Sequence, residues 1–187
     1  KYILSNKIYH VFYDYIFTSP SLNMEFSRTG LREDVTLMML SNTLKEIAAD
    51  YNVFMMSGTQ VNRGWEKRHF RNENNIAGSK AIADKADFGM IATRLTDEEI
   101  EAIGPLIKEL NLEMPNVVID IYKNRRGKII NAKIFRSFDY GTCRITDLIL
   151  TDTNYNMMHN LDKIDYSYKI KDLLEIAVEN RSKKDVS

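Results

Sequence analysis

The sequence of 187 residues has little cysteine, proline or glycine, and each scarcity excludes something. The single cysteine, Cys143, excludes an internal disulfide framework and a zinc site built from several cysteines, and it favours a reducing, cytosolic compartment. With only 3 prolines and 8 glycines, most of the chain is expected to lie in regular elements. The sequence has no apolar run of about 18 residues, so we expect no transmembrane helix.

Net charge is also lacking, because 26 Lys and Arg residues balance 26 Asp and Glu residues. Bulk charge therefore predicts neither nucleic-acid nor membrane binding, and any such surface must be local. Residues 62–80 hold five basic and two acidic residues, and residues 121–136 hold six basic residues and no acid. Residues 95–120 offset them with seven acids and one lysine. The basic residues of the first segment are Arg63, Lys67, Arg68, Arg71 and Lys80.

The order of apolar runs and helical stripes predicts an α/β fold with a mostly parallel sheet that ends in an antiparallel hairpin. Strands are expected at 8–16, 53–57, 88–93, 117–122, 129–135 and 143–149, and helices at 34–51, 79–86, 97–110 and 166–181. Loops are expected at 17–34 and 61–76. Thr96 and Glu99 form a capping-box pattern that opens the third helix, which Pro105 is expected to kink or split.

Two polar residues follow predicted strands, at the sheet edge where ligands bind in open α/β folds. Asp14 ends the first strand and Gln60 follows the second. A carboxylate in this place suits magnesium, which binds through one or two carboxylates, phosphate and water, and an amide can bind a phosphate oxygen. The alternative is an acid that caps a turn and a polar residue in an ordinary loop.

The two basic segments each fit two interpretations. Trp65, His69 and Phe70 are interleaved with the cations of residues 62–80, which suits phosphate contacts and base stacking on a single strand. The alternative is a solvated loop with Trp65 and Phe70 in the core. In the second segment, an arginine on the hairpin within 121–136 can reach a phosphate bound to a neighbouring subunit. The alternative is a hairpin whose cations are only solvated.

Four segments, in this order, resemble the C-terminal ATPase domain of replicative hexameric helicases of the DnaB type and the related phage primase-helicases. They are VFYDYI (11–16), LKEIAADYNVFMMSGTQVNR (44–63), IAGSKAIADKADFGMI (76–91) and IYKNRRGKIINAKIFRSFDYGTCRI (121–145). The resemblance covers about residues 8–146. It implies a RecA-like, mostly parallel sheet with flanking helices.

The resemblance also implies roles for single residues. Asp14 is similar to the family's Walker B acid, which holds Mg²⁺, here expected through water, and Gln60 to the glutamine that senses the γ-phosphate of ATP. Lys123 and Arg125 match the positions that reach the neighbour's nucleotide, with Arg125 as the arginine finger. The residues expected to contact single-stranded DNA are Arg63, Lys67, Arg68, Arg71, Gly78, Ser79 and Lys80. The implied cofactors are ATP and Mg²⁺, and the implied partners are single-stranded DNA, further copies of the chain in a hexamer, and a primase or helicase loader. No membrane is implied, and the expected compartment is the cytoplasm of a bacterial or phage-infected cell.

The sequence also departs from the family. It contains no G-x-x-x-x-G-K-[ST] loop to cradle phosphates, and the family's catalytic glutamate is missing. We therefore expect residues 1–149 to form the C-terminal part of a motor domain, residues 150–187 to form an extension with a helix, and this chain alone not to hydrolyse ATP. Two other functions fit the residues: another RecA-like ATPase, such as a recombinase or signalling ring, and a non-catalytic module that binds single-stranded DNA or oligomerises.

Overall fold

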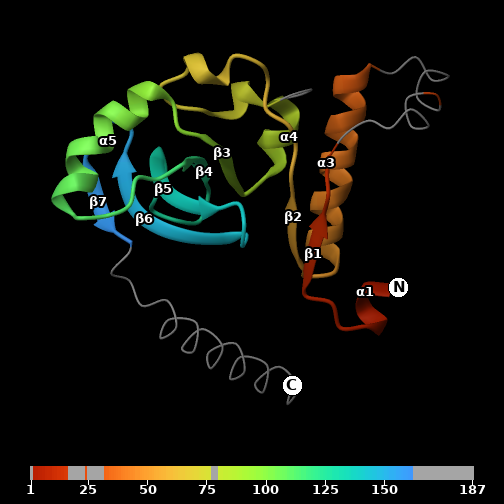
Figure 1. Cartoon of the computed structure of the whole chain (residues 1–187). Coiled ribbons are helices and arrows are strands. Elements are labelled where there is room, and N and C mark those ends of the chain that lie inside the picture. The colour runs from red at the N-terminus through yellow and green to blue at the C-terminus, as the bar shows by residue number, and fades with distance from the viewer. Residues whose placement is uncertain (1, 17–23, 25–31, 77–79, 162–187) are drawn as a thin grey trace.

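In the computed structural model, which describes residues 2–16, 24, 32–76 and 80–161, the strands form two separate sheets. A short helix, α1 (Tyr2–Ser5), precedes strand β1 (His10–Tyr13), which pairs in parallel with β2 (Phe54–Ser57). The second sheet has five strands in the order of the chain: β3 (Phe88–Arg94), β4 (Val117–Asn124), β5 (Ala132–Asp139), β6 (Arg144–Asp152) and β7 (Met157–Asn160). Figure 1 shows the two sheets side by side, with helix α4 (Lys80–Lys85) between them.

Helix α3 (Glu33–Asp50) connects β1 to β2 and packs on them. Its first turn carries Glu33 and Asp34, whose charge complements the positive end of the helix dipole. Its stripe of Leu37, Leu40 and Leu44 packs with Ile16 in one apolar cluster. The predicted helix and the predicted β–α–β crossover in this segment are therefore confirmed.

The five-stranded sheet is antiparallel throughout. Two of its turns are short and are closed by aspartates. Asp139 accepts hydrogen bonds from the amide of Gly141 (2.8 Å) and the hydroxyl of Thr142 (2.7 Å). Asp152 accepts from the amides of Asn154 (2.8 Å) and Asn156 (2.9 Å). Such short connections leave room only for antiparallel neighbours.

The predicted RecA-like, mostly parallel sheet with flanking helices is therefore wrong, since only β1 and β2 are parallel. The error arises at residues 95–116, which contain a helix and were expected to form a crossover between parallel strands. Instead β4 runs back beside β3 in the opposite direction. Side chains along β3 alternate between exposed and buried, which is typical of an antiparallel sheet with one solvated face.

Helix α5 (Asp97–Glu109) covers one face of this sheet (Figure 1). Its residues Ile103 and Ile107 pack on Val118, Phe135 and Ile149, and Ile103, Val118, Phe135 and Ile149 are fully buried. The predicted capping box is confirmed, because the Thr96 hydroxyl accepts from the Glu99 amide and the Glu99 carboxylate accepts from the Thr96 amide. Pro105 lies inside the helix and does not split it.

Other predictions have mixed outcomes. The domain boundary expected at residue 149 falls inside β6, and β7 was not predicted. The helix expected at 166–181 and most of the loop at 17–34 lie outside the described residues. Among the helices that the structure describes, none is long and apolar enough to cross a membrane.

Candidate functional site

The carboxyl ends of β1 and β2 bring Asp14 and Gln60 to the same edge of the parallel sheet. Hydrogen bonds join the two segments just beyond the strands: the Ile16 amide donates to Gly58 O (2.9 Å), and the Thr59 hydroxyl donates to Ile16 O (3.3 Å). Asp14 and Gln60 are both exposed. Within the described ranges no group of three or more His, Cys, Asp or Glu side chains could hold a metal ion by itself. That is compatible with Mg²⁺ held mainly by water and phosphate.

Lys123 and Arg125, at the end of β4 and just beyond it, contact the C-terminal end of α4. The Lys123 Nζ donates to Ala83 O (2.8 Å) and Asp84 O (3.0 Å), and Arg125 Nη2 donates to Asp84 O (2.9 Å). Cations at this end of a helix satisfy free carbonyls and complement its dipole. Burial of the Lys123 ammonium, together with the charge of Arg125, lowers its pKa. In this chain both side chains are therefore engaged with α4, and a nucleotide on a neighbour would have to compete for them.

Asp87 connects this corner to the parallel unit. Its carboxylate forms an ion pair with Lys45 of α3 and lies 3.5 Å from Arg125 Nη1. The hydrogen bond from Lys45 and the nearby charges of Lys45 and Arg125 lower the pKa of Asp87. The Ser41 hydroxyl of α3 also donates to Ile82 O (3.2 Å) in α4. The parallel unit is thus tied through α4 to the antiparallel sheet.

The predicted DNA loop is a loop with two short 3-10 turns, η1 (Trp65–Lys67) and η2 (Glu73–Asn75). Arg63, Lys67 and Arg68 are exposed along it. Lys80, at the start of α4, is also exposed and lies 3.7 Å from the Glu73 carboxylate. Gly78 and Ser79 lie outside the described residues.

Arg71 departs from the expectation for this loop, because its side chain is fully buried. Its guanidinium binds two carboxylates: Nη1 lies 2.6 Å from Glu99 Oε1 and 2.9 Å from Asp120 Oδ2, and Nη2 lies 3.0 Å from Glu99 Oε2. It is therefore not available to a DNA phosphate, and the predicted DNA-binding set loses this member.

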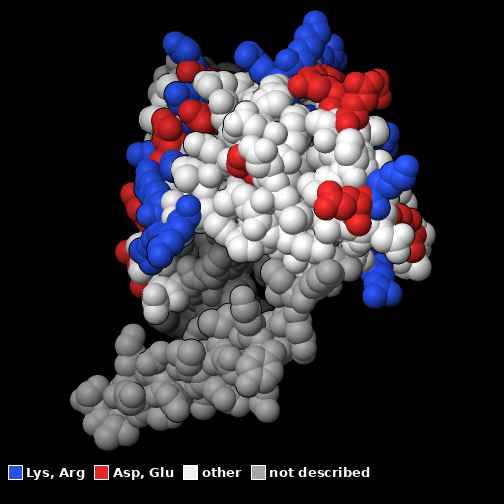
Figure 2. Space-filling model, turned by 90° about the vertical axis from the view of Figure 1, so that its left-hand side faces the viewer, with Lys and Arg blue, Asp and Glu red and all other residues white. Residues whose placement is uncertain are grey.

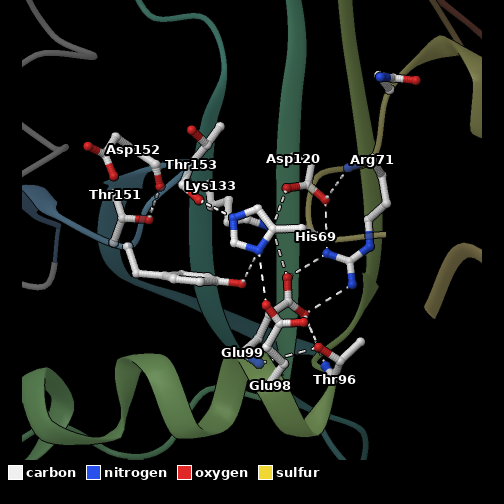
Figure 3. Close-up of polar contacts among 12 residues, drawn as sticks. His69, Arg71, Thr96, Glu98, Glu99, Asp120, Lys133, Thr151, Asp152 and Thr153 are labelled. Carbon is white, nitrogen blue, oxygen red and sulfur yellow. Dashed lines mark hydrogen bonds and ion pairs between the residues drawn. The ribbon is translucent and has the colours of Figure 1, made fainter. Parts of the chain in front are cut away.

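Arg71 belongs to a buried quartet of charges, completed by Glu99, Asp120 and Lys133 (Figure 3). The Lys133 Nζ lies 2.8 Å from Glu99 Oε1 and 2.9 Å from Asp120 Oδ1, so each cation contacts both acids. Burial by itself raises the pKa of Glu99, but the hydrogen bonds from Arg71 and Lys133 outweigh it and lower the pKa to about 2. The quartet is charge-balanced, which is the condition under which buried charges are tolerated.

The quartet joins three regions of the sequence. Arg71 comes from the loop, Glu99 from the first turn of α5, and Asp120 and Lys133 from paired positions on β4 and β5. It therefore assigns part of the acidic segment 95–120 a structural role that the sequence reasoning missed. A signal was present, because Asp120 interrupts an apolar strand and Lys133 interrupts the next one.

Aromatic residues of the loop pack on the same quartet. The Arg71 guanidinium lies 5.3 Å from the Trp65 ring centre, and the Lys133 Nζ lies 5.8 Å from that of Phe70. Trp65 and Phe70 are both half-buried. His69 faces outward, with Nε2 2.6 Å from Thr153 O and Nδ1 3.1 Å from Glu98 Oε1 (Figure 3). The loop is thus fastened to the sheet from inside by Arg71 and from outside by His69.

The face that carries α5 and β7 differs from the loop. Figure 2 shows a broad area with few charged side chains, and most of the charges on this face, of both signs, lie nearer its margins. The exposed apolar side chains of these two elements are Ile100, Met157 and Met158. Phosphate binding requires a denser basic surface than this face presents, so the candidate DNA contacts remain those of the loop.

Comparison with known proteins shows a similarity to a prophage protein but no match to a family model. No protein-family model matches the chain. The chain is 34% identical over 165 residues to the SPbeta prophage-derived uncharacterized protein YorI of Bacillus subtilis (strain 168). The aligned part is 84% of this chain but only 33% of that protein, so the chain spans about a third of the length of the curated relative it matches.

Proposed function

We propose that the chain is part of a ring-forming replicative DNA helicase, which couples ATP hydrolysis to movement along single-stranded DNA and to duplex unwinding. The observation that supports this best is the β1–α3–β2 unit, with Asp14 and Gln60 beyond the carboxyl ends of its parallel strands. Ligands of open α/β sheets bind at such edges. The proposal rests on this unit and on the four resembling segments, two of which, 76–91 and 121–145, contribute to strands of the antiparallel sheet.

In this proposal Asp14 holds Mg²⁺ through water and Gln60 senses the γ-phosphate of ATP. Arg125, with Lys123, stabilises the charge of the transferred phosphoryl group in the neighbouring subunit, after exchanging its contact with α4 for phosphate. Arg63, Lys67 and Arg68 contact the DNA backbone. The partners are single-stranded DNA, other copies in a hexamer and a primase or loader, and the compartment is the cytosol.

The proposal predicts that the 187-residue chain does not turn over ATP by itself. Its sequence contains no P-loop, so the amides and lysine that bind the β- and γ-phosphates are missing. Robust, magnesium-dependent ATP turnover by the purified chain would contradict this assignment of roles.

The natural protein that carries these residues provides the functional test. We expect it to displace the strand of a forked duplex only with ATP and Mg²⁺, and Asp14→Asn to lower the ATPase rate by roughly 100-fold or more, as for the loss of other groups that stabilise developing charge. Asp50→Asn is the matched control, since Asp50 is an exposed acid at the end of α3 and lies outside the site. Equal rates for the two variants would refute the role of Asp14.

A second function is favoured by the loop itself. The loop is anchored by the buried Arg71 and presents Arg63, Lys67 and Arg68 to solvent, which suits a module that binds single-stranded DNA without catalysis. Binding through three phosphates predicts a slope of about −2 in a plot of log affinity against log salt. If the natural protein binds DNA with this slope but shows no ATPase activity, the second function replaces the first.

A further inference from the structure

A pocket lies beside the charged quartet on the face of the five-stranded sheet that α5 covers in part. Asp120, Lys133 and Thr151 form one cross-strand row of this face. The Tyr122 side chain packs against the cluster that contains Ile91, the residue of β3 paired with Asp120, and therefore lies on the same face. Between Tyr122 and the loop is an open pocket of about 560 Å³. This volume falls within the range of ~300–1,000 Å³ that is usual for small-ligand sites.

The lining of the pocket is aromatic and amide-rich. Phe70 and Tyr122 contribute rings, Asn72 and Asn131 contribute amides, and Glu73 contributes a carboxylate. No lysine or arginine of the described chain lines it. A pocket without a cation does not suit a phosphate, whereas rings with amide donors and acceptors suit a flat heterocycle that carries its own donors and acceptors.

The walls of the pocket are held in place by contacts outside it. A Cβ atom added to Gly89 would lie 2.3 Å from the Tyr122 ring, so this ring rests directly on the glycine. Asn72 caps η2, with its side chain accepting from the Asn74 amide (3.0 Å). His69, also at the pocket, joins the loop to the turn after β6 through Thr153 O. These contacts therefore hold the walls of the pocket in place without a bound ligand.

We propose that this pocket binds one unstacked base of single-stranded DNA. The inference rests on the proposed function only in taking DNA as the ligand of the loop. The exposed Arg63, Lys67 and Arg68 lie on the same loop and contact the phosphates, while the base stacks on Phe70 or Tyr122. Base stacking on aromatic side chains is a general mode of single-strand recognition.

Glu73 gives the pocket a hydrogen-bond acceptor for the base. One of its oxygens, Oε1, lies 3.7 Å from Lys80 Nζ, and the other can accept a hydrogen bond from a donor on the base edge. Cytosine, adenine and guanine offer an exocyclic amino group, and an unpaired thymine offers its ring N3–H. The pocket therefore accepts any of the four bases and requires that a base be present.

The test compares three labelled oligonucleotides of equal length and charge by fluorescence anisotropy: oligo-dC, oligo-dT and a strand of abasic sites. We expect the chain to bind oligo-dC and oligo-dT about fivefold or more tightly than the abasic strand, since only the abasic strand loses the stacking and the hydrogen bond. Glu73→Ala, which removes the acceptor, should lower the ratio of oligo-dC affinity to abasic affinity. Glu66→Ala, at an exposed acid on the same loop, should leave that ratio unchanged.

The outcomes separate the pocket from the proposed function. Equal affinity of the wild-type chain for all three strands, with a salt dependence, would overturn the pocket and leave the helicase proposal standing. If the base-bearing strands bind more tightly than the abasic strand but the natural protein shows no ATP-dependent unwinding, the helicase proposal fails and the pocket stands. An advantage over the abasic strand that Glu73→Ala does not reduce would overturn the role of the carboxylate.

Discussion

The buried charge quartet predicts a large and specific effect for Glu99→Gln. Glutamine keeps the shape of the side chain. Both Glu99 oxygens accept hydrogen bonds, Oε1 from Arg71 and Lys133 and Oε2 from Arg71 and Thr96, so the substitution removes the charge and replaces one acceptor with an NH2 donor that faces other donors. Arg71 and Lys133 would then share the single carboxylate of Asp120 in a fully buried site. Removing one partner from a buried ion pair costs about 3–5 kcal/mol of unfolding free energy.

The pKa of Glu99 gives an independent magnitude. A shift from 4.5 to about 2 corresponds to about 3 kcal/mol of stabilisation, in agreement with the first figure. Because the folded-state pKa is below the unfolded value, this stability is fully present above about pH 4.5 and is lost as the pH falls toward about 2. The difference in stability between the wild type and Glu99→Gln should therefore be largest at neutral pH and should shrink in acid.

Urea unfolding, followed by Trp65 fluorescence and by far-UV circular dichroism, measures this effect. Trp65 is the single tryptophan and contacts Arg71, so its emission reports on the quartet directly. Glu98→Gln is the control, because the Glu98 side chain is 68% exposed and neighbours Glu99 in the same helix turn. We expect the control to change stability by less than about 0.5 kcal/mol. If Glu99→Gln costs no more than Glu98→Gln at pH 7, the reasoning about the quartet is refuted.

Three further predictions concern the fold. Phe135→Ala should lower the unfolding free energy by about 3–5 kcal/mol, because Phe135 lies in the core. Phe88 is 48% exposed, so Phe88→Ala should lower it by far less. Equal losses of unfolding free energy in urea would contradict the assignment of Phe135 to the core. Gly89→Ala should destabilise the protein by more than about 1 kcal/mol, because the added Cβ would clash with the Tyr122 ring. Gly58→Ala is the control, since its Cβ would meet nothing nearer than 3.9 Å, and it should leave the melting temperature nearly unchanged. Thr96→Ala should cost about 1 kcal/mol through loss of the cap on α5, and an unchanged melting temperature would argue against that cap.

Local patterns predicted the elements that depend on neighbouring residues. Helix α3 follows from its apolar stripe, and the start of α5 follows from the reciprocal bonds of Thr96 and Glu99. The turns of the antiparallel sheet were predictable where connections are short. The direction of β4 relative to β3 was not predictable, because residues 95–116 are long enough to return the chain either way.

The residues of the candidate site likewise divide into those that the sequence predicts and those that only the tertiary structure reveals. Asp14 and Gln60 share one edge because they follow two strands joined by one helix, and that order is visible in the sequence. The burial of Arg71 depends on Glu99, 28 residues away, and on Asp120, 49 residues away. No local pattern within the loop separates Arg71 from the exposed Arg68, so only the tertiary structure distinguishes the structural arginine from the candidate DNA contacts.

The central claim is that these residues belong to a DNA motor driven by ATP. The most direct measurement is displacement of the labelled strand of a forked duplex by the natural protein, with and without ATP and Mg²⁺. Displacement that requires both, and that stops in Asp14→Asn while continuing in Asp50→Asn, is the predicted result. No displacement by the wild-type protein, or displacement that proceeds without ATP, would contradict the claim.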